Sequence, residues 1–329
     1  MKSKGPQTQK EIGNSMSDQK NSVLEFVSPS LENISAVRDF LKAGSENLFS
    51  LEDNPNTMLF WRDLYNYRFA LYENSLFIMT NAKQRLYLLP FSDDLEKAVN
   101  ILAENTEGGL ENISFLACEG QRLDEFKKVY ADSFSINPSR DDFEYIYSSK
   151  DLIELKGSKY HTKRNHISFF TREFDWTYEP ITKENVSDVI LMAEKWKDLM
   201  NKIKKSESIS AEYESTKFML SHMDELNIKG GLIRANGNVA AFTYGSPINS
   251  RVFDIHVEKA LPEYRTAYAV INREFARHCL SDYEYINRED DMGLEGLRAA
   301  KLSYHPTLLL KKYILSYKNN EAQNKNEKE

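Results

Sequence analysis

The side chains best suited to chemistry gather in the segment 287–306. Three consecutive carboxylates stand where an aromatic, β-prone segment ends, and two cations three residues apart follow on a short helical pattern. Side chains at this spacing share one helix face. Such a cluster is typical of a binding site, although an ion-paired, solvated loop has the same composition. The candidates are Glu289 and Asp290 for an amine, Arg298 and Lys301 for a phosphate, with Asn287, Asp291 and Tyr304 beside them.

A second group of titratable side chains alternates with apolar residues along one predicted strand. Its members are Asp254, His256 and Glu258. Successive side chains of a strand point to opposite faces, so we expect these three on one face. A face of acids suits an amine acceptor, because one carboxylate can hold the ammonium while a neighbouring group takes its proton. We therefore predict a catalytic group of Asp254, His256, Glu258 and Glu289, in which His256 is either the base or a structural side chain.

A basic run opens the helix predicted at 160–170. It contains Lys156, Lys159, Lys163 and Arg164, together with His161 and His166. Lys159 and Lys163 are four residues apart and face the same way. A cationic helix start can hold phosphate, because its free backbone N–H groups add to the charge. The run is therefore a candidate site for coenzyme A, a phospholipid head group or the acceptor end of tRNA, unless it is only a solvated helix face.

Both halves of the chain show the same order of predicted elements: strand, helices, three-strand meander, helix, strand, helix and strand. The meanders lie at 67–91 and 230–257, and Asn236-Gly237 is a strong hairpin signal. Further signals are helix starts at Asn54-Pro55 and Asp93-Asp94 and a last apolar strand at 307–314. The pattern predicts an α+β fold with two tandem lobes, each a mixed, mostly antiparallel sheet flanked by helices. The predicted division is a disordered tail at 1–21, lobes at 22–155 and 156–318, and a second disordered tail at 319–329.

Composition excludes several classes of protein. The chain has 329 residues and a net charge of -7, with 41% hydrophobic and 28% charged residues, as in an ordinary soluble protein. No apolar run reaches the ~18 residues of a spanning helix, so we expect no stable membrane insertion. Cys118 and Cys279 are far apart, and a signal-peptide pattern is absent, which favours a cytoplasmic location. The spacings typical of zinc sites, phosphate loops and nucleophile elbows are also absent, so we expect no metal.

Four blocks of sequence carry a resemblance to a known family. They are 156–166, 237–245, 254–260 with Tyr264, Arg265 and Asn272, and 287–306. In these blocks the chain resembles the uncharacterised bacterial proteins grouped with the C-terminal domain of phosphatidylglycerol lysyltransferases. Its order of elements resembles the fold of the Gcn5-related N-acetyltransferases (GNAT), used twice. The resemblance implies transfer of an acyl or aminoacyl group, from coenzyme A or aminoacyl-tRNA, to an amine or hydroxyl of a small molecule or peptide.

The resemblance also bears on the donor. In acyltransferases of this fold, the helix after the meander opens with Arg or Gln and spaced glycines that cradle pyrophosphate. Here Arg265 is present, but Thr266 and Ala267 follow it, and their side chains hinder close backbone approach. This departure weakens a coenzyme A donor and is compatible with aminoacyl-tRNA. Asn272 on the same helix is expected to orient Asp254 or Asn287.

Two alternatives to a transferase of the cytoplasm remain open at this point. The same cleft could hold an amino acid, peptide or nucleotide without catalysis. An enzyme acting on lipid at the membrane surface is the other alternative, against which the net negative charge counts. In either case Gly245 would allow another backbone to approach the predicted strand 239–246 closely.

Overall fold

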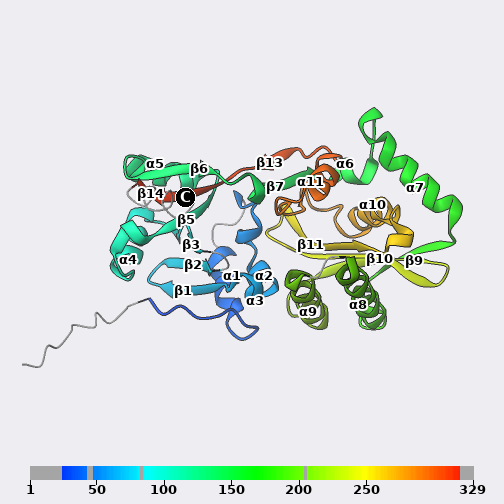
Figure 1. Cartoon of the computed structure of the whole chain (residues 1–329), viewed down its shortest axis with the longest axis horizontal. Helices are drawn as coiled ribbons and strands as arrows, with labels where there is room; N and C mark the ends of the chain where they lie inside the picture. Colours follow the sequence, from blue (N-terminus) through cyan, green and yellow to red (C-terminus); the bar gives the residue numbers. More distant parts are fainter. Residues whose placement is uncertain (1–23, 43–46, 82–83, 204–205, 319–329) are drawn as a thin grey trace, which may run out of the picture.

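The computed structural model describes residues 24–42, 47–81, 84–203 and 206–318. Within them the chain forms two mixed β-sheets that stand side by side, each flanked by helices (Figure 1). The predicted α+β fold with two lobes is therefore confirmed. The tails predicted at 1–21 and 319–329 lie outside the described residues.

The first sheet has seven strands, in the order β1-β2-β3-β5-β14-β6, with β4 paired to β2. Its pairs are antiparallel except that of β3 with β5, which run parallel. The strands are β1 (Arg68–Tyr72), β2 (Ser75–Asn81), β3 (Arg85–Leu88), β4 (Phe91–Ser92), β5 (Ser114–Cys118), β6 (Phe134–Pro138) and β14 (Lys312–Tyr317).

The second sheet also has seven strands, in the order β13-β7-β12-β11-β10-β9-β8. Only β11 and β12 run parallel within it. The strands are β7 (Glu144–Ser148), β8 (Trp176–Pro180), β9 (Lys229–Ala235), β10 (Asn238–Pro247), β11 (Val252–Ala260), β12 (Tyr285–Asn287) and β13 (Leu308–Leu310). The predicted hairpin is confirmed, because Asn236 and Gly237 join β9 to β10 with φ values of 48° and 82°. Two successive positive φ angles suit the twist of a tight hairpin.

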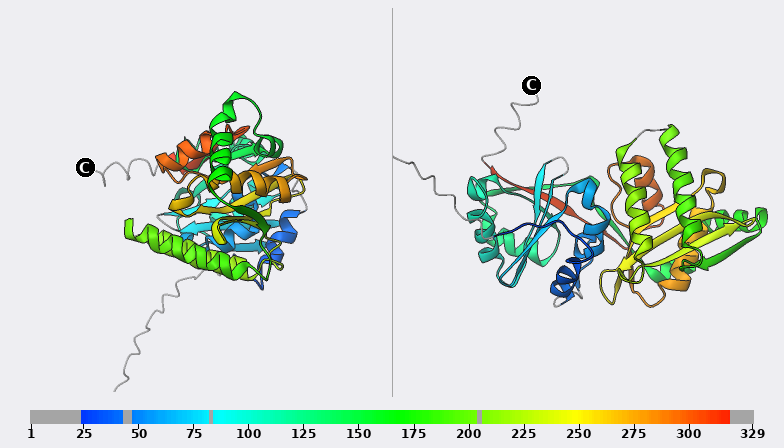
Figure 2. Two further views of the ribbon diagram at one scale, coloured as in Figure 1. Left: turned by 90° about the vertical axis from the view of Figure 1, so that its right-hand side faces the viewer. Right: turned by 90° about the horizontal axis from the view of Figure 1, so that it is seen from below.

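Helices cover the second sheet on both sides. Figure 1 shows α10 with α6 and α11 above it, and Figure 2 shows the long pair α8 and α9 across the opposite side. The helices are α1 (Ile34–Lys42), α2 (Pro55–Phe60), α3 (Arg62–Tyr65), α4 (Leu95–Glu104), α5 (Gln121–Tyr130), α6 (Ser149–Glu154), α7 (His161–Glu173), α8 (Val186–Ile203), α9 (Glu207–Ser221), α10 (Ala267–Cys279) and α11 (Glu295–Leu302). The predicted starts of α2 and α4 are confirmed, since the side chains of Asn54 and Asp94 cap them. Among the described residues, no helix combines the length and the apolar character that crossing a bilayer requires.

The lobes exchange strands. β7 follows the first sheet in the chain but pairs with β12 and β13 in the second, while β14 returns from the second lobe to pair between β5 and β6. The single strand expected at 307–314 is therefore wrong, because the chain changes sheets at Lys311. The backbone N–H of Lys311 donates to Glu119 Oε1 at 3.0 Å, which fixes this crossing. The division at residues 155 and 156 stays a prediction, and neither sheet is built from one continuous segment.

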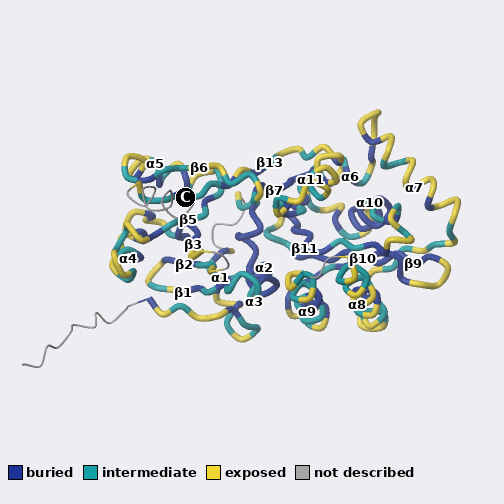
Figure 3. The backbone as a smooth tube through the Cα atoms, viewed as in Figure 1, coloured by how far each residue is buried: buried dark blue, intermediate teal, exposed yellow. Residues whose placement is uncertain are grey.

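A buried ion cluster holds the crossing strand between the lobes. Lys312 Nζ lies 2.6 Å from Glu52 Oε1 and 2.5 Å from Glu144 Oε1, and only 1% of Lys312 is exposed. Burial raises the pKa of Glu144 to about 7, whereas that of Lys312 stands well above its usual value because two carboxylates face it. In Figure 3 both α2 and the central strands of the second sheet are coloured as buried, and one cluster of buried apolar side chains contains residues of both, so the lobes share one interior.

Candidate active site

The parallel strands β11 and β12 separate after three paired positions. Their register covers Val252 to Asp254 against Tyr285 to Asn287, and β11 then continues alone on this side to Ala260. The chain that leaves β12 carries Arg288 and Glu289 along the other edge of the split. Charged side chains thus stand on both diverging edges of a sheet interior, where polar groups are costly without partners.

A β-bulge in β11 distributes these side chains over two faces. The register to β10 shifts between Tyr244 and Gly245, so His256 is an extra residue in β11. A Cβ atom on Gly245 would stand 1.9 Å from the Asp254 carbonyl oxygen, so glycine is needed opposite the bulge. The expectation that Asp254, His256 and Glu258 share one face is therefore wrong. An extra residue reverses the alternation that follows it.

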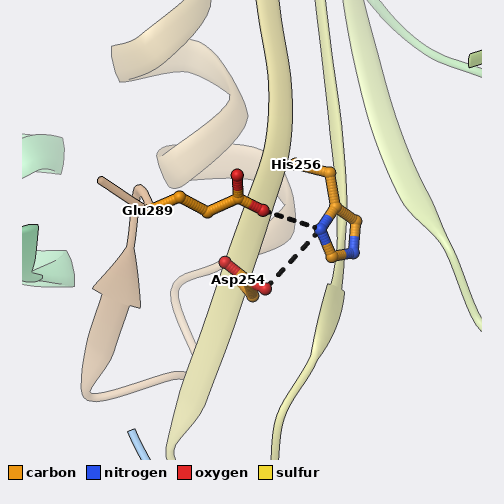
Figure 4. Close-up of side chains that lie close together, drawn as sticks. All are labelled: Asp254, His256 and Glu289. Atoms are coloured by element: carbon orange, nitrogen blue, oxygen red, sulfur yellow. Dashed lines mark hydrogen bonds and ion pairs between the residues drawn. The ribbon is translucent and has the colours of Figure 1, made fainter. Parts of the chain in front are cut away.

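On the face toward α2, Asp254 and Glu289 both approach His256 (Figure 4). His256 Nδ1 lies 3.1 Å from Glu289 Oε1 and 3.5 Å from Asp254 Oδ2. His256 Nε2 lies 2.8 Å from Ser246 Oγ, and the first lobe reaches in through Asn54 Nδ2, which donates to Asp254 Oδ2 at 3.2 Å. The side chains of Asp254 and His256 are completely buried. Burial raises the pKa of Asp254 and of Glu289 well above the usual range and lowers that of His256.

On the face toward α10, Glu258 lies among three polar partners. Its Oε1 accepts from Arg288 Nη2 at 2.8 Å, and its Oε2 accepts from Asn272 Nδ2 at 3.0 Å. The expectation that Asn272 orients Asp254 or Asn287 is wrong, because α10 places it against Glu258. Among the described residues, Arg288 Nη1 and Asn272 Oδ1 are buried without a hydrogen-bond partner. One free donor and one free acceptor thus flank a carboxylate that is 9% exposed.

Tyr304 and Lys163 complete this face. The Arg288 guanidinium lies 4.8 Å from the centre of the Tyr304 ring, and Lys163 Nζ lies 3.8 Å from the same ring. Burial and the nearby Arg288 lower the pKa of Lys163 to about 8. Burial lowers the pKa of His166 most, and the charges of Lys163 and Arg265 lower it further. The three side chains therefore lie close together where α7 meets the start of α10.

The remaining basic residues of the first α7 turns make contacts of their own. Lys159 Nζ lies 3.2 Å from Asp151 Oδ2, and Arg164 Nη1 donates to the carbonyls of Leu155 and Gly157. The structure therefore places Lys163 near the ion pair of Glu258 and Arg288, whereas Lys159 and Arg164 are bound elsewhere. Their predicted role in donor binding stays a prediction.

The loop after β12 is held by its own charges. Arg298 binds Asp291 through two nitrogens, at 2.9 and 2.8 Å, and Asp141 at 2.7 Å. These bonds hold the pKa of Asp291 well below its usual range, although burial alone would raise it. Lys301 Nζ donates to the backbone carbonyls of Arg288 and Asp290, and burial lowers its pKa to about 8. These cations hold the turn together, and a role toward donor phosphate stays a prediction.

The last predicted loop residues stand near the lobe junction. Asn287 Oδ1 accepts from the Glu289 backbone N–H at 2.7 Å, and its Nδ2 donates to Phe49 O and Glu144 Oε2. It thereby supports Glu289 in a left-handed conformation, with φ 56°. Burial raises the pKa of the half-buried Asp290 to about 6. Strained backbone of this kind often occurs at functional sites.

Sequence reasoning missed several members of the site. Arg288 stands next to the predicted acids but was not singled out, although a cation among acids is a signal of pairing. Ser246 carried no signal, and Asn54 carried only that of a helix start, since their roles at the site depend on the bulge and on contact between the lobes.

The chain is similar to known proteins over most of its length. The sequence profile of the family described as "Phosphatidylglycerol lysyltransferase, C-terminal" matches residues 48–316. A conserved protein of unknown function from Bacteroides thetaiotaomicron is 33% identical, with a TM-score of 0.82 over 90% of this chain and all of that one. The structure of L-PGS from Bacillus licheniformis is 17% identical, with a TM-score of 0.59 over 87% of this chain and 92% of that one, which shows a shared fold.

A curated relative is also similar. An uncharacterized protein of Mycoplasmoides gallisepticum is 26% identical over 176 residues, which are 52% of this chain. The chain spans about half the length of that relative, since the match covers 55% of it.

Proposed function

Because this chain belongs to the phosphatidylglycerol lysyltransferase C-terminal family, we propose that it transfers an aminoacyl or acyl group to an amine or hydroxyl at the split between β11 and β12. The observation that carries the proposal is the free donor of Arg288 and the free acceptor of Asn272 on either side of Glu258. Buried polar atoms without partners are rare in native proteins, and each needs an explanation. A substrate between the diverging strands would supply the missing partners.

The two groups suit the two needs of acyl transfer. The acceptor nitrogen attacks the carbonyl carbon of the donor, and the carbon–oxygen or carbon–sulfur bond to the carrier then breaks. Glu258 binds the acceptor as its ammonium, which loses one proton to water to become the attacking amine. Glu258 then takes the proton that the nitrogen loses as the new bond forms, and this proton passes to the departing oxygen or sulfur. Arg288 Nη1 donates to the carbonyl oxygen as negative charge develops on it. Both side chains are held by the strands, so little reorganisation is needed.

The donor enters from the edge where α7 meets α10. Lys163, Arg265 and His166 gather there, and Lys163 is close to Tyr304 on the same face as Glu258. The carrier's phosphates would lie against this cationic edge. Because Thr266 and Ala267 stand where spaced glycines would admit a pyrophosphate, aminoacyl-tRNA is the favoured donor and a coenzyme A thioester the second. Both are molecules of the cytoplasm, where we place the activity.

Asp254, His256 and Glu289 act as positioning residues in this proposal. Two of them are sealed from solvent, and all three lie on the face away from Glu258. They fix the end of β12 against β11 and so set the separation of Glu258 and Arg288. The sequence suggests His256 as the possible base, and we propose Glu258 for this role instead.

The test is transfer by the purified full chain. Aminoacyl-tRNAs and acyl coenzyme A carrying a labelled acyl group are offered with a panel of amines and alcohols, and labelled product is counted. We expect labelled product with aminoacyl-tRNA. The Arg288→Lys variant should form less product, because lysine keeps the positive charge but lacks the free Nη1 donor. Stabilisation by one ligand in a thermal-shift screen, without product from any donor, would instead indicate a binding protein.

A further inference from the structure

The sealed face of β11 offers the donor set of a cation site. We propose that Asp254, His256 and Glu289 bind a divalent transition-metal ion, which ties the end of β12 to the bulge of β11. One nitrogen and two carboxylate oxygens converge here, and their ligand atoms all lie within 4.8 Å of one another. Figure 4 shows both carboxylates directed at the same imidazole nitrogen, from β11 and from the turn after β12. Sequence motifs do not predict this site, because the three residues have none of the spacings of known metal-binding motifs.

The separations suit an ion at the centre. His256 Nδ1 lies 3.1 Å from Glu289 Oε1 and 3.5 Å from Asp254 Oδ2. Ligand bonds of about 2.0–2.2 Å at tetrahedral or octahedral angles place neighbouring donor atoms about 3.0–3.6 Å apart. The two distances to His256 fall in this range, and the two carboxylates, whose ligand oxygens lie within 4.8 Å of each other, would close on the ion as it binds.

The charges at this face call for a cation. Two carboxylates lie against a fully buried imidazole, and no lysine or arginine of the described chain forms an ion pair with either of them. Burying a carboxylate without a direct cationic partner is costly. Asp254 Oδ1 is also buried without a hydrogen-bond partner among the described residues, as an independent sign of a missing ligand.

Neighbouring side chains would orient the ligands. Ser246 Oγ lies 2.8 Å from His256 Nε2, so this nitrogen can carry the proton and leave the Nδ1 lone pair for the ion. Asn54 Nδ2 and Thr57 Oγ1 donate to Asp254 Oδ2 at 3.2 and 3.4 Å. Partners of this kind, on the far side of the ligands, commonly raise metal affinity.

The donor set also selects the ion. Imidazole with carboxylates suits zinc or manganese, whereas magnesium and calcium prefer oxygen ligands alone. Because Asp254 and His256 are inaccessible, the ion is structural and does not meet the substrate. The proposal therefore does not depend on transfer activity.

The test uses the full chain after dialysis against a chelator. Titration calorimetry and metal analysis should show about one zinc or manganese per chain, and the melting temperature should rise with added ion but not with magnesium. His256→Gln and Glu289→Gln should weaken binding by more than about 100-fold, and Ser246→Ala by about 10- to 100-fold. Glu212→Gln, which alters a carboxylate of α9 that pairs with Lys259 of β11 and not with the three ligands, should leave binding unchanged.

A second measurement guards against variants that do not fold. Cobalt added to the unaltered chain should give visible absorption bands typical of nitrogen and oxygen ligation, and zinc should remove them. The proposal fails if the unaltered chain binds neither zinc nor manganese. It also fails if folded His256→Gln and Glu289→Gln bind as tightly as the unaltered chain, or if magnesium raises the melting temperature equally.

Discussion

The two lobes connect their strands in the same order. They differ in the side chains that lie where the parallel strand pair of each lobe separates. In the first, β1, β2 and β3 lead through α4 to β5, which runs parallel to β3 over two pairs, Tyr87 with Phe115 and Leu88 with Leu116. In the second, β9, β10 and β11 lead through α10 to β12, parallel to β11 over three pairs. Each sheet then accepts a strand from the other lobe, next to the strand that ends its own unit.

Beyond the split, the two lobes diverge in chemistry. The first continues with apolar residues, Leu89 and Phe91, and Arg122 covers the Phe91 ring at 3.6 Å while it pairs with Asp53. The second has its bulge there, with Glu258 and Arg288 on one face. At the split of the first lobe, Arg122, Asp53, Glu52 and Lys312 line a small pocket and are paired with one another, whereas the split of the second lobe has buried polar atoms without partners. The proposed function therefore depends on the side chains at the split, because the two lobes share the arrangement of their strands.

The largest effect is expected at the strand exchange that unites the lobes. Lys312→Met leaves Glu52 and Glu144 buried without their cation and should lower the free energy of unfolding by about 3–5 kcal/mol. Chemical denaturation at neutral pH measures it. Lys311→Met is the matched control, because this neighbour is exposed and its loss should cost no more than about 0.5 kcal/mol.

The pH dependence sharpens this prediction. Both carboxylates become protonated in acid, in the folded and the unfolded chain, and a neutral acid no longer needs Lys312. The difference between Lys312→Met and the unaltered chain should therefore begin to shrink as pH falls through about 7, where Glu144 takes up a proton, and shrink further in acid, where Glu52, whose pKa is lowered in the folded chain, takes up its own. A difference that stays constant from neutral to acid pH would show that lost packing, and not charge, is responsible.

A smaller effect is expected at the bulge that distinguishes the second lobe. Gly245→Ala places a Cβ atom against the Asp254 carbonyl and should lower the free energy of unfolding by about 1–3 kcal/mol. Gly296 provides the control, because it lies in α11 with open space around its Cβ position. There, alanine should stabilise the helix by up to about 1 kcal/mol. Equal thermal stability of the two variants would contradict the close approach at the bulge.

The smallest effect concerns the cationic edge of the second lobe, where α7 meets the start of α10. Lys163 has a pKa of about 8, lowered by burial and Arg288, so it is charged below this pH and neutral above it. Affinity for an anionic donor should therefore fall severalfold as pH rises from 7 to 9. Lys163→Arg stays charged over this range and should remove the dependence. Filter binding of aminoacyl-tRNA at fixed ionic strength checks both, and the same fall in Lys163→Arg would exclude this lysine.

Local signals predicted much of this fold. The hairpin at Asn236-Gly237 and the helix caps at Asn54 and Asp94 depend on neighbouring residues, and all were predicted correctly. The strand at 307–314 was not, because its division between two sheets depends on partners far away in the sequence. Lys312 lies within that apolar pattern, and its burial follows from carboxylates that the first lobe supplies.

The site was predicted by residue type better than by arrangement. Acids, a histidine and cations of the predicted segments lie together in the structure, and they were predicted because titratable groups within apolar patterns stand out. Their division over two faces could not be foreseen, since one extra residue at His256 reverses the alternation. The bulge depends on Gly245 in the neighbouring strand, and the sequence of β11 alone contains no sign of it.

The most direct test of the account compares transfer by two matched variants. Glu258→Gln alters the carboxylate at the split of the second lobe, and Glu119→Gln alters the one that follows β5 in the first lobe. Labelled aminoacyl transfer should fall by about 10²- to 10⁴-fold in Glu258→Gln and stay unchanged in Glu119→Gln. Undiminished transfer by a folded Glu258→Gln variant would contradict the placement of the reaction between β11 and β12.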